Sequence, residues 1–141
     1  MSSPTVHTIK TFQDAGWVVQ TVERWIPQAK KRIDLLGFID LLAFKLGYVI
    51  AIQTTSTSNI SSRQSKILSK PLRKNLRLWL SVPQHYIHVW GWSKKGPARS
   101  RKLWMPVVRD IAFVDRLPLV TDITAGIVDV LNQSKPVLKQ E

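Results

Sequence analysis

Cysteine is absent from this sequence, and acidic residues and long apolar runs are scarce. Without cysteine, neither a disulfide framework nor a thiolate zinc site can form. No apolar run approaches the roughly 20 residues that cross a bilayer, and the amino terminus lacks the basic-then-apolar pattern of a secretory signal. We therefore expect a soluble, cytoplasmic protein with no membrane partner.

Two binding patterns are also missing. The three histidines, His7, His85 and His88, lack the spacing of metal ligands, which disfavours a zinc site. No glycine-rich loop of the kind that cradles phosphates is present, so we expect no nucleotide cofactor. A chain of 141 residues that is 44% apolar suits one globular domain. We place this domain at 1–134 and expect 135–141 to form a flexible tail.

Positive charge is abundant. Lysine and arginine number 21 against 9 aspartate and glutamate residues, a net charge of +12. Such an excess favours a polyanionic partner, most commonly nucleic acid, although a merely solubilising basic surface is the alternative. The basic residues form two clusters, one with helical spacing and one in a loop: Lys66, Lys70, Arg73, Lys74 and Arg77, then Lys94, Lys95, Arg99, Arg101 and Lys102.

No acidic residue lies between Lys66 and Arg109. An ordinary solvated helix face usually mixes both signs of charge, so the clusters are better explained as phosphate contacts. Trp90 and Trp92 share one face of a predicted strand, which is more typical of core packing than of base stacking.

Hydrophobic periodicity predicts an α/β fold. Helices are expected at 5–15, 59–68, 71–80 and 121–134, and strands at 17–25, 33–44, 48–54, 85–92 and 102–108. The economical way to bury these faces is a central mixed five-stranded sheet flanked by helices, in the order α-β-β-β-α-β-β-α. The apolar segment 48–54 is expected to lie mid-sheet and to be covered on both faces.

One stretch, GFIDLLAFKLGYVIAIQTTSTSN at 37–59, combines an aspartate within an apolar strand with a second strand that ends in a polar triplet. Asp40 could simply satisfy backbone donors, and the polar run could cap the helix that follows at Ser58 or Asn59. Alternatively, Asp40 and Gln53 are ligands of one metal site. A glutamine at the end of an otherwise apolar strand favours the second interpretation.

This order of elements resembles the core of the PD-(D/E)XK nuclease superfamily. Residues 37–56 resemble archaeal-type Holliday junction resolvases and their phage and bacterial relatives, which carry G-x-x-D-x-x-A in one strand and acid-x-lysine-serine at the end of the next. By this match Asp40 falls on the metal-binding aspartate, Gln53 on the second acid and Thr55 on the lysine. Only Asp40 keeps the residue type of the family. The resemblance implies a restriction-endonuclease-like core and a Mg²⁺- or Mn²⁺-dependent endonuclease that cuts branched or structured DNA.

Such chemistry needs oxygen ligands for the metal and positive charge for the phosphate. Gln53 offers a neutral amide oxygen, and the resemblance implies the Thr54 carbonyl as a further ligand. A second carboxylate is expected from Glu23 in the preceding strand, or from Asp34, which shares the pleat parity of Asp40 unless Gly37 introduces a bulge. Thr55 carries no charge, so the cation is expected from the following helix, at Lys66 or Arg63.

Three functional hypotheses follow. The first is a metal-dependent endonuclease, for which Asp40, Gln53, Thr55 and Lys66 are the candidate catalytic residues. The second is a catalytically inactive nuclease-fold protein that binds DNA as an accessory factor, and the third is a basic RNA-binding module. Two related cuts in a two-fold symmetric junction also predict a homodimer, although the same apolar surfaces could cover the sheet of a monomer.

Overall fold

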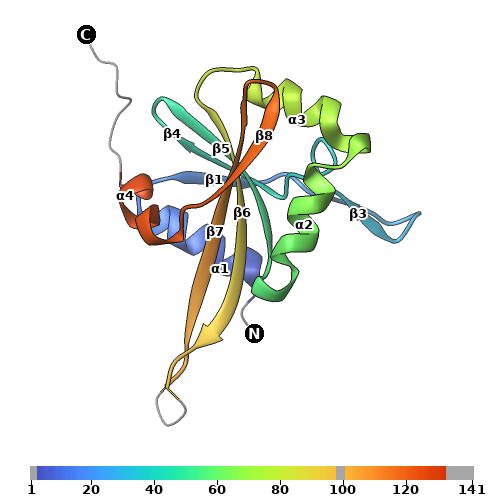
Figure 1. Ribbon diagram of the computed structural model, residues 1–141. Coiled ribbons are helices and arrows are strands. Elements are labelled where there is room, and N and C mark those ends of the chain that lie inside the picture. The colour runs from blue at the N-terminus through green and yellow to red at the C-terminus, as the bar shows by residue number, and fades with distance from the viewer. Residues whose placement is uncertain (1–2, 98–100, 133–141) are drawn as a thin grey trace.

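The computed structural model of the protein describes residues 3–97 and 101–132 (Figure 1). It has an α/β fold in which a mixed six-stranded sheet carries four α-helices, with a separate two-stranded hairpin. The strand order is β1-β4-β5-β6-β7-β8, and within it only β5 and β6 run parallel. The parallel pair is joined by a helical crossover, as parallel strands require.

The strands of the sheet are β1 (Val18–Thr21), β4 (Leu41–Lys45), β5 (Tyr48–Ser56), β6 (His85–Lys95), β7 (Leu103–Val114) and β8 (Leu117–Asp122). The hairpin consists of β2 (Arg24–Ile26) and β3 (Lys31–Ile33). The helices are α1 (Pro4–Asp14), α2 (Ile60–Ile67), α3 (Arg73–Leu80) and α4 (Ile127–Leu131). Short 3₁₀ turns precede α2, α3 and α4 at Thr57–Asn59, Lys70–Leu72 and Thr124–Gly126.

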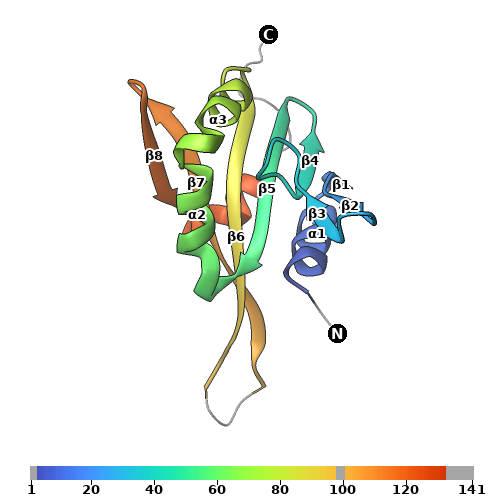
Figure 2. The same cartoon turned by 90° about the vertical axis from the view of Figure 1, so that its right-hand side faces the viewer.

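The sheet is covered on both faces. Helices α1 and α4 pack on one face through side chains such as Phe12 and Leu131, and α2 and α3 pack on the other through Ile67 and Leu76 (Figure 2). Successive residues of β5 alternate between the two cores, which confirms that the apolar segment 48–54 lies mid-sheet with both faces buried. The predicted core positions of Trp90 and Trp92 are also confirmed.

Local signals explain where α1 begins and ends. The Ser3 hydroxyl accepts a 3.2 Å hydrogen bond from the Val6 amide, and Pro4 occupies the first turn, where its missing N–H is not needed. Gly16, at φ 92°, follows the last turn in the left-handed region that glycine tolerates. The predicted helices at 5–15, 59–68 and 71–80 are thus confirmed within a few residues.

The sheet has six strands, so the prediction of five was wrong. The missed strand, β8, lies at the edge of the sheet, where its apolar residues are mostly exposed and Pro118 can be tolerated. The expected C-terminal helix at 121–134 was also too long. Its first residues end β8, a 3₁₀ turn follows, and α4 covers only Ile127–Leu131. Residues 133–134, like the predicted tail 135–141, lie outside the described residues.

Two predicted long strands are each interrupted. The segment 17–25 divides into β1 and β2, and the Val22 amide between them donates to the Asp40 carbonyl at 2.9 Å. The segment 33–44 turns at Leu36 and Gly37, whose φ angles are 55° and 87°, so β4 begins only after Asp40. None of the helices in the described part of the chain is long and apolar enough to span a membrane.

Candidate metal centre

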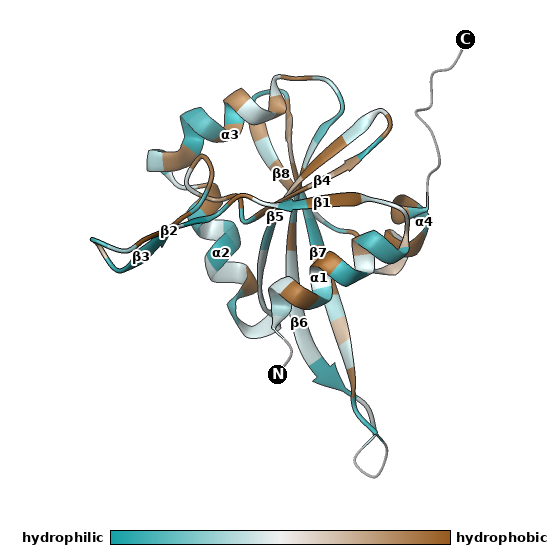
Figure 3. Cartoon of the chain, turned by 180° about the vertical axis from the view of Figure 1, so that it is seen from behind, coloured by the Kyte–Doolittle hydropathy of each residue, from teal (hydrophilic) through white to brown (hydrophobic). Residues whose placement is uncertain are grey.

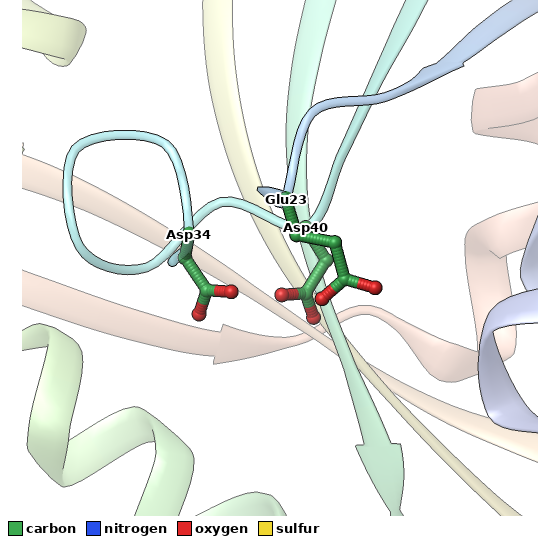
Figure 4. Close-up of side chains that lie close together, drawn as sticks. All are labelled: Glu23, Asp34 and Asp40. Carbon is green, nitrogen blue, oxygen red and sulfur yellow. The ribbon is translucent and has the colours of Figure 1, made fainter. Parts of the chain in front are cut away.

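Three acidic side chains converge where β1 and β4 meet the hairpin (Figure 4). Asp40 directly precedes β4, and its amide donates to the Ile52 carbonyl at 2.9 Å, which places it across from Gln53 on β5. Glu23 and Asp34 lie at the two ends of the hairpin, Glu23 just before β2 and Asp34 just after β3. The hairpin thus brings two carboxylates to the aspartate at the start of β4.

The three carboxylates are close enough to share one cation. One oxygen from each of Glu23, Asp34 and Asp40 lies within 4.8 Å of the other two, and Asp40 is buried while its neighbours are half-buried. Negative charges this close repel one another, and the repulsion is strengthened by burial. A hard divalent cation, which prefers oxygen ligands, would relieve this repulsion.

The Asp40 carboxyl is held firmly. Its Oδ2 accepts hydrogen bonds from Gln53 Nε2 and from the Thr54 amide, both at 2.9 Å, and from the Thr54 hydroxyl at 3.4 Å. Burial raises the pKa of this carboxyl to about 7, against the opposing effect of the Thr54 N–H. The charge of Asp34 and a hydrogen bond between the two carboxyls also raise it. Below about pH 7 the protonated form of Asp40 therefore predominates, and an incoming cation would displace that proton.

Gln53 provides an independent indication of a ligand. It is 2% exposed, it lines the pocket beside the carboxylates, and its Oε1 has no hydrogen-bond partner among the described residues. A buried acceptor without a partner is costly, and an amide oxygen is an acceptable ligand for Mg²⁺. The oxygen donors present at this position therefore fit a hard divalent cation.

Positive side chains complete the pocket, which has a volume of about 320 Å³. Arg63 and Lys66 reach it from α2, and Arg32 reaches it from β3. Arg32 Nη1 also donates to Glu23 Oε1 at 2.9 Å. The pocket thus places carboxylates for a cation next to guanidinium and ammonium groups that suit a phosphate.

Most of the predicted site residues are brought together. The residues that line the pocket include Asp40, Gln53, Thr54, Glu23, Asp34, Arg63 and Lys66. Thr55 is buried and is not among the described residues that line it. Thr54 contacts Asp40 through its amide and hydroxyl, whereas the prediction had singled out its carbonyl.

The reason given for Asp34 was wrong. It does not share a regular strand with Asp40, because the chain turns between them, and the turn itself brings the two carboxyls together. Two lining residues were missed. Arg32 lies between the predicted strands 17–25 and 33–44, and Thr5, whose hydroxyl lies 2.9 Å from the Thr54 hydroxyl, is the first residue of the predicted helix at 5–15. The residues of β2 (Arg-Trp-Ile) and β3 (Lys-Arg-Ile) show no regular apolar–polar alternation, so this pattern gave no signal for the hairpin.

The predicted phosphate-binding clusters are exposed but differently arranged. Lys66, Lys70, Arg73, Lys74 and Arg77 do not share one unbroken helix, because a 3₁₀ turn containing Pro71 separates α2 from α3. In the second cluster, Lys94 and Lys95 belong to β6, and Arg101 and Lys102 directly precede β7. Arg99 lies outside the described residues.

No protein-family model, curated protein or solved structure matches this chain. A functional assignment therefore depends on the geometry of the carboxylate pocket and on the chemistry that its residues can support.

Proposed function

We propose that the protein is a Mg²⁺- or Mn²⁺-dependent endodeoxyribonuclease of the PD-(D/E)XK type that acts on branched or structured DNA. The observation that carries this proposal is the convergence of Glu23, Asp34 and Asp40 beside the unpaired Gln53 oxygen. The order α1, β1, β4, β5, α2 and β6 supports it, since an aspartate at the start of β4 and a polar triplet on β5 occupy the expected elements.

The ligand set compensates for the variant motif. A bound divalent cation would neutralise phosphate charge and lower the pKa of a coordinated water. Asp40, Asp34 and Glu23 would hold it, with Gln53 Oε1 as a neutral ligand. The charge that is lost with glutamine in place of an acid is therefore supplied from the two ends of the hairpin.

Helix α2 supplies the positive charge that Thr55 lacks. Arg63 and Lys66 are three residues apart on α2 and both line the pocket, so they can contact one phosphate from the same side. In this proposal they bind the phosphate to be cleaved and orient it toward the carboxylates. Orientation of this kind is a main source of rate enhancement in phosphoryl transfer.

Replacement of Asp40 tests the proposal. Asp40→Ala should abolish Mg²⁺-dependent cleavage of a labelled four-way junction, while DNA affinity stays equal or rises because a negative charge beside the phosphates is lost. Asp129→Ala, which removes an exposed carboxylate from α4, is the matched control and should cut at the parental rate. Parental cleavage by Asp40→Ala would place the reaction elsewhere.

A second candidate function is favoured by the motif itself. Gln53 and Thr55 stand where an acid and a lysine are expected, so the chain could bind DNA without cutting it. The two candidates differ in one result. A parent protein that binds junction DNA but leaves it intact with both Mg²⁺ and Mn²⁺ would be an accessory DNA-binding protein.

The proposal includes a homodimer, because one two-fold assembly can make both cuts in a symmetric junction. The shortened α4 still exposes Val128, an apolar side chain available for such a contact. Light scattering at micromolar protein concentration, with and without a four-way junction, tests this part. A monomer under both conditions would leave a simpler nuclease.

A further inference from the structure

The β2–β3 hairpin stands apart from both hydrophobic cores. Among the described residues, neither core cluster takes a side chain from β2 or β3. The hairpin projects from the body of the molecule beyond α2 (Figure 3). The residues of β2 and β3 therefore belong to neither core, and the side chains that they present to solvent can be examined for a function.

Trp25 is the largest of these residues and is 53% exposed. The hairpin also carries four basic residues, Arg24, Lys30, Lys31 and Arg32, and Arg32 lies directly opposite Trp25. An exposed indole on a basic hairpin combines a flat stacking surface with groups that attract phosphates. The same cations repel a second copy of this hairpin, so a nucleic acid suits the surface better than self-association does.

The register of the hairpin places Trp25 next to the carboxylate pocket. Trp25 pairs directly with Arg32, and opposite residues of an antiparallel pair project from the same face. Arg32 lines the pocket and bonds to Glu23. The indole therefore stands on the hairpin face that adjoins the site, not on the face turned away from it.

Stacking on an indole requires a base whose face is free. In an intact duplex the bases are stacked on one another, so a protein aromatic side chain reaches a base face only where pairing is interrupted. On the other side of the pocket, Arg63 and Lys66 can hold the backbone. We infer that Trp25 stacks on an unpaired base beside the phosphate bound in the carboxylate pocket. The hairpin thereby selects branched, flapped or single-stranded DNA over plain duplex.

This inference rests on the proposed function and is tested separately from it. A duplex with a single-stranded flap, carrying the fluorescent base 2-aminopurine at the first unpaired position, is compared with a fully paired duplex, both without divalent ions. The parent should quench the 2-aminopurine. Trp25→Ala should lose this quenching and bind the flap about 5- to 100-fold more weakly, with duplex affinity changed less than about twofold.

Two variants make the result specific. Trp25→Phe keeps an aromatic face and should retain part of the quenching and of the flap preference. Leu117→Ala removes a 69% exposed apolar side chain from β8, far along the sheet order from the hairpin, and should change neither affinity. Circular dichroism of each variant should match the parent, since Trp25 contributes to neither core.

The possible outcomes distinguish failure of the stacking role of Trp25 from failure of the proposed nuclease function. If Trp25→Ala loses equal affinity for flap and duplex, or loses affinity for neither, the stacking role is wrong. The proposed nuclease activity would then still be tested by cleavage with Asp40→Ala. A parent that binds no DNA would overturn both. Light scattering could instead show that Trp25→Ala converts a dimer to a monomer. In that case Trp25 contacts a second copy of the chain and not a nucleobase.

Discussion

Gln53 donates a 2.9 Å hydrogen bond from Nε2 to Asp40 Oδ2, while its own buried Oε1 has no partner among the described residues. An amide can do both at once, because it carries a donor and an acceptor. A carboxylate at the same position would have no donor to offer and would be a fourth acidic group in the site. The glutamine therefore stabilises the ionised form of Asp40 and leaves one neutral oxygen for a cation.

Gln53→Glu tests this division of roles. Without divalent ions, we expect the variant to lose about 1–3 kcal/mol of unfolding free energy, because it buries another charge beside Asp40. With saturating Mg²⁺ the loss should shrink, because a more negative site binds the cation more tightly. Thermal melts with EDTA and with Mg²⁺ measure both effects.

Gln13→Glu is the matched control, since it makes the same change at an exposed position on α1. We expect it to alter both melts by a few tenths of a kcal/mol at most. If Gln53→Glu lowers stability equally in EDTA and in Mg²⁺, no cation binds beside this residue.

The raised pKa of Asp40 predicts how stability depends on pH. The pKa of its carboxyl is about 7 in the folded chain, against an ordinary 3.8, so between these values the folded state holds a proton that the unfolded state releases. The contribution of Asp40 is thus full below pH 3.8 and is lost as pH rises through 7. Asp40→Asn should therefore exceed the parent in unfolding free energy by about 1–3 kcal/mol at pH 8 in EDTA.

Urea denaturation between pH 4 and pH 8 measures this difference, which should approach zero toward pH 4. Asp129→Asn, on the exposed surface of α4, should show no pH-dependent difference from the parent. Parallel pH profiles for the parent and Asp40→Asn would mean that Asp40 does not titrate near neutrality in the folded chain.

The fold could be predicted where the sequence pattern reflects burial. The apolar run of β5 and the helical spacing that follows it gave the sheet centre and its crossover, because both faces of that strand are covered. Strand β8 was not predicted, because an edge strand buries little surface and its sequence therefore need not alternate between apolar and polar residues. The turn at Leu36 and Gly37 was not predicted, because its apolar neighbours pack into the core as strand residues do.

The site was predictable to the extent that it follows strand pairing. Antiparallel pairing of β4 with β5 puts Asp40 across from Gln53, and both were identified from the polar interruption of apolar strands. Arg32 was not, because its place depends on a hairpin that has no core residues and hence no strong apolar pattern. Local propensity alone could not show that the ends of that hairpin return to Asp40.

Gly37 links the turn of the site to the helical layer. Its φ is 87°, and a Cβ at this position would lie 2.6 Å from Leu72 Cδ2. Gly37→Ala should therefore cost about 1–3 kcal/mol of unfolding free energy. Because Asp34 and Asp40 flank this turn, the variant should also reduce the rise in melting temperature that Mg²⁺ produces.

Two other glycines distinguish the cost of a positive φ from the cost of the clash with Leu72. Gly16→Ala meets nothing within 4 Å but keeps a φ of 92°, so it measures the backbone cost alone. Gly126→Ala meets neither obstacle and should be close to neutral. Gly37→Ala could lose only as much unfolding free energy as Gly16→Ala and keep the full rise in melting temperature with Mg²⁺. In that case the clash of the added Cβ with Leu72 does not disturb the site.

The exposed cations of α3 allow a test of DNA binding that is independent of cleavage. Arg73, Lys74 and Arg77 are all solvent-exposed, with Arg77 lying over the Phe113 ring at 5.7 Å. If each contacts one phosphate, replacing all three with alanine should reduce the slope of log affinity against log salt by roughly 3, alike for every DNA sequence. Fluorescence anisotropy with a labelled junction across a range of salt concentrations gives the slope.

Lys10→Ala on α1, which packs on the opposite face of the sheet, is the control and should leave the slope unchanged. An unchanged slope for the triple variant, with an unchanged circular dichroism spectrum, would mean that this face of α3 is an ordinary solvated surface that does not contact DNA.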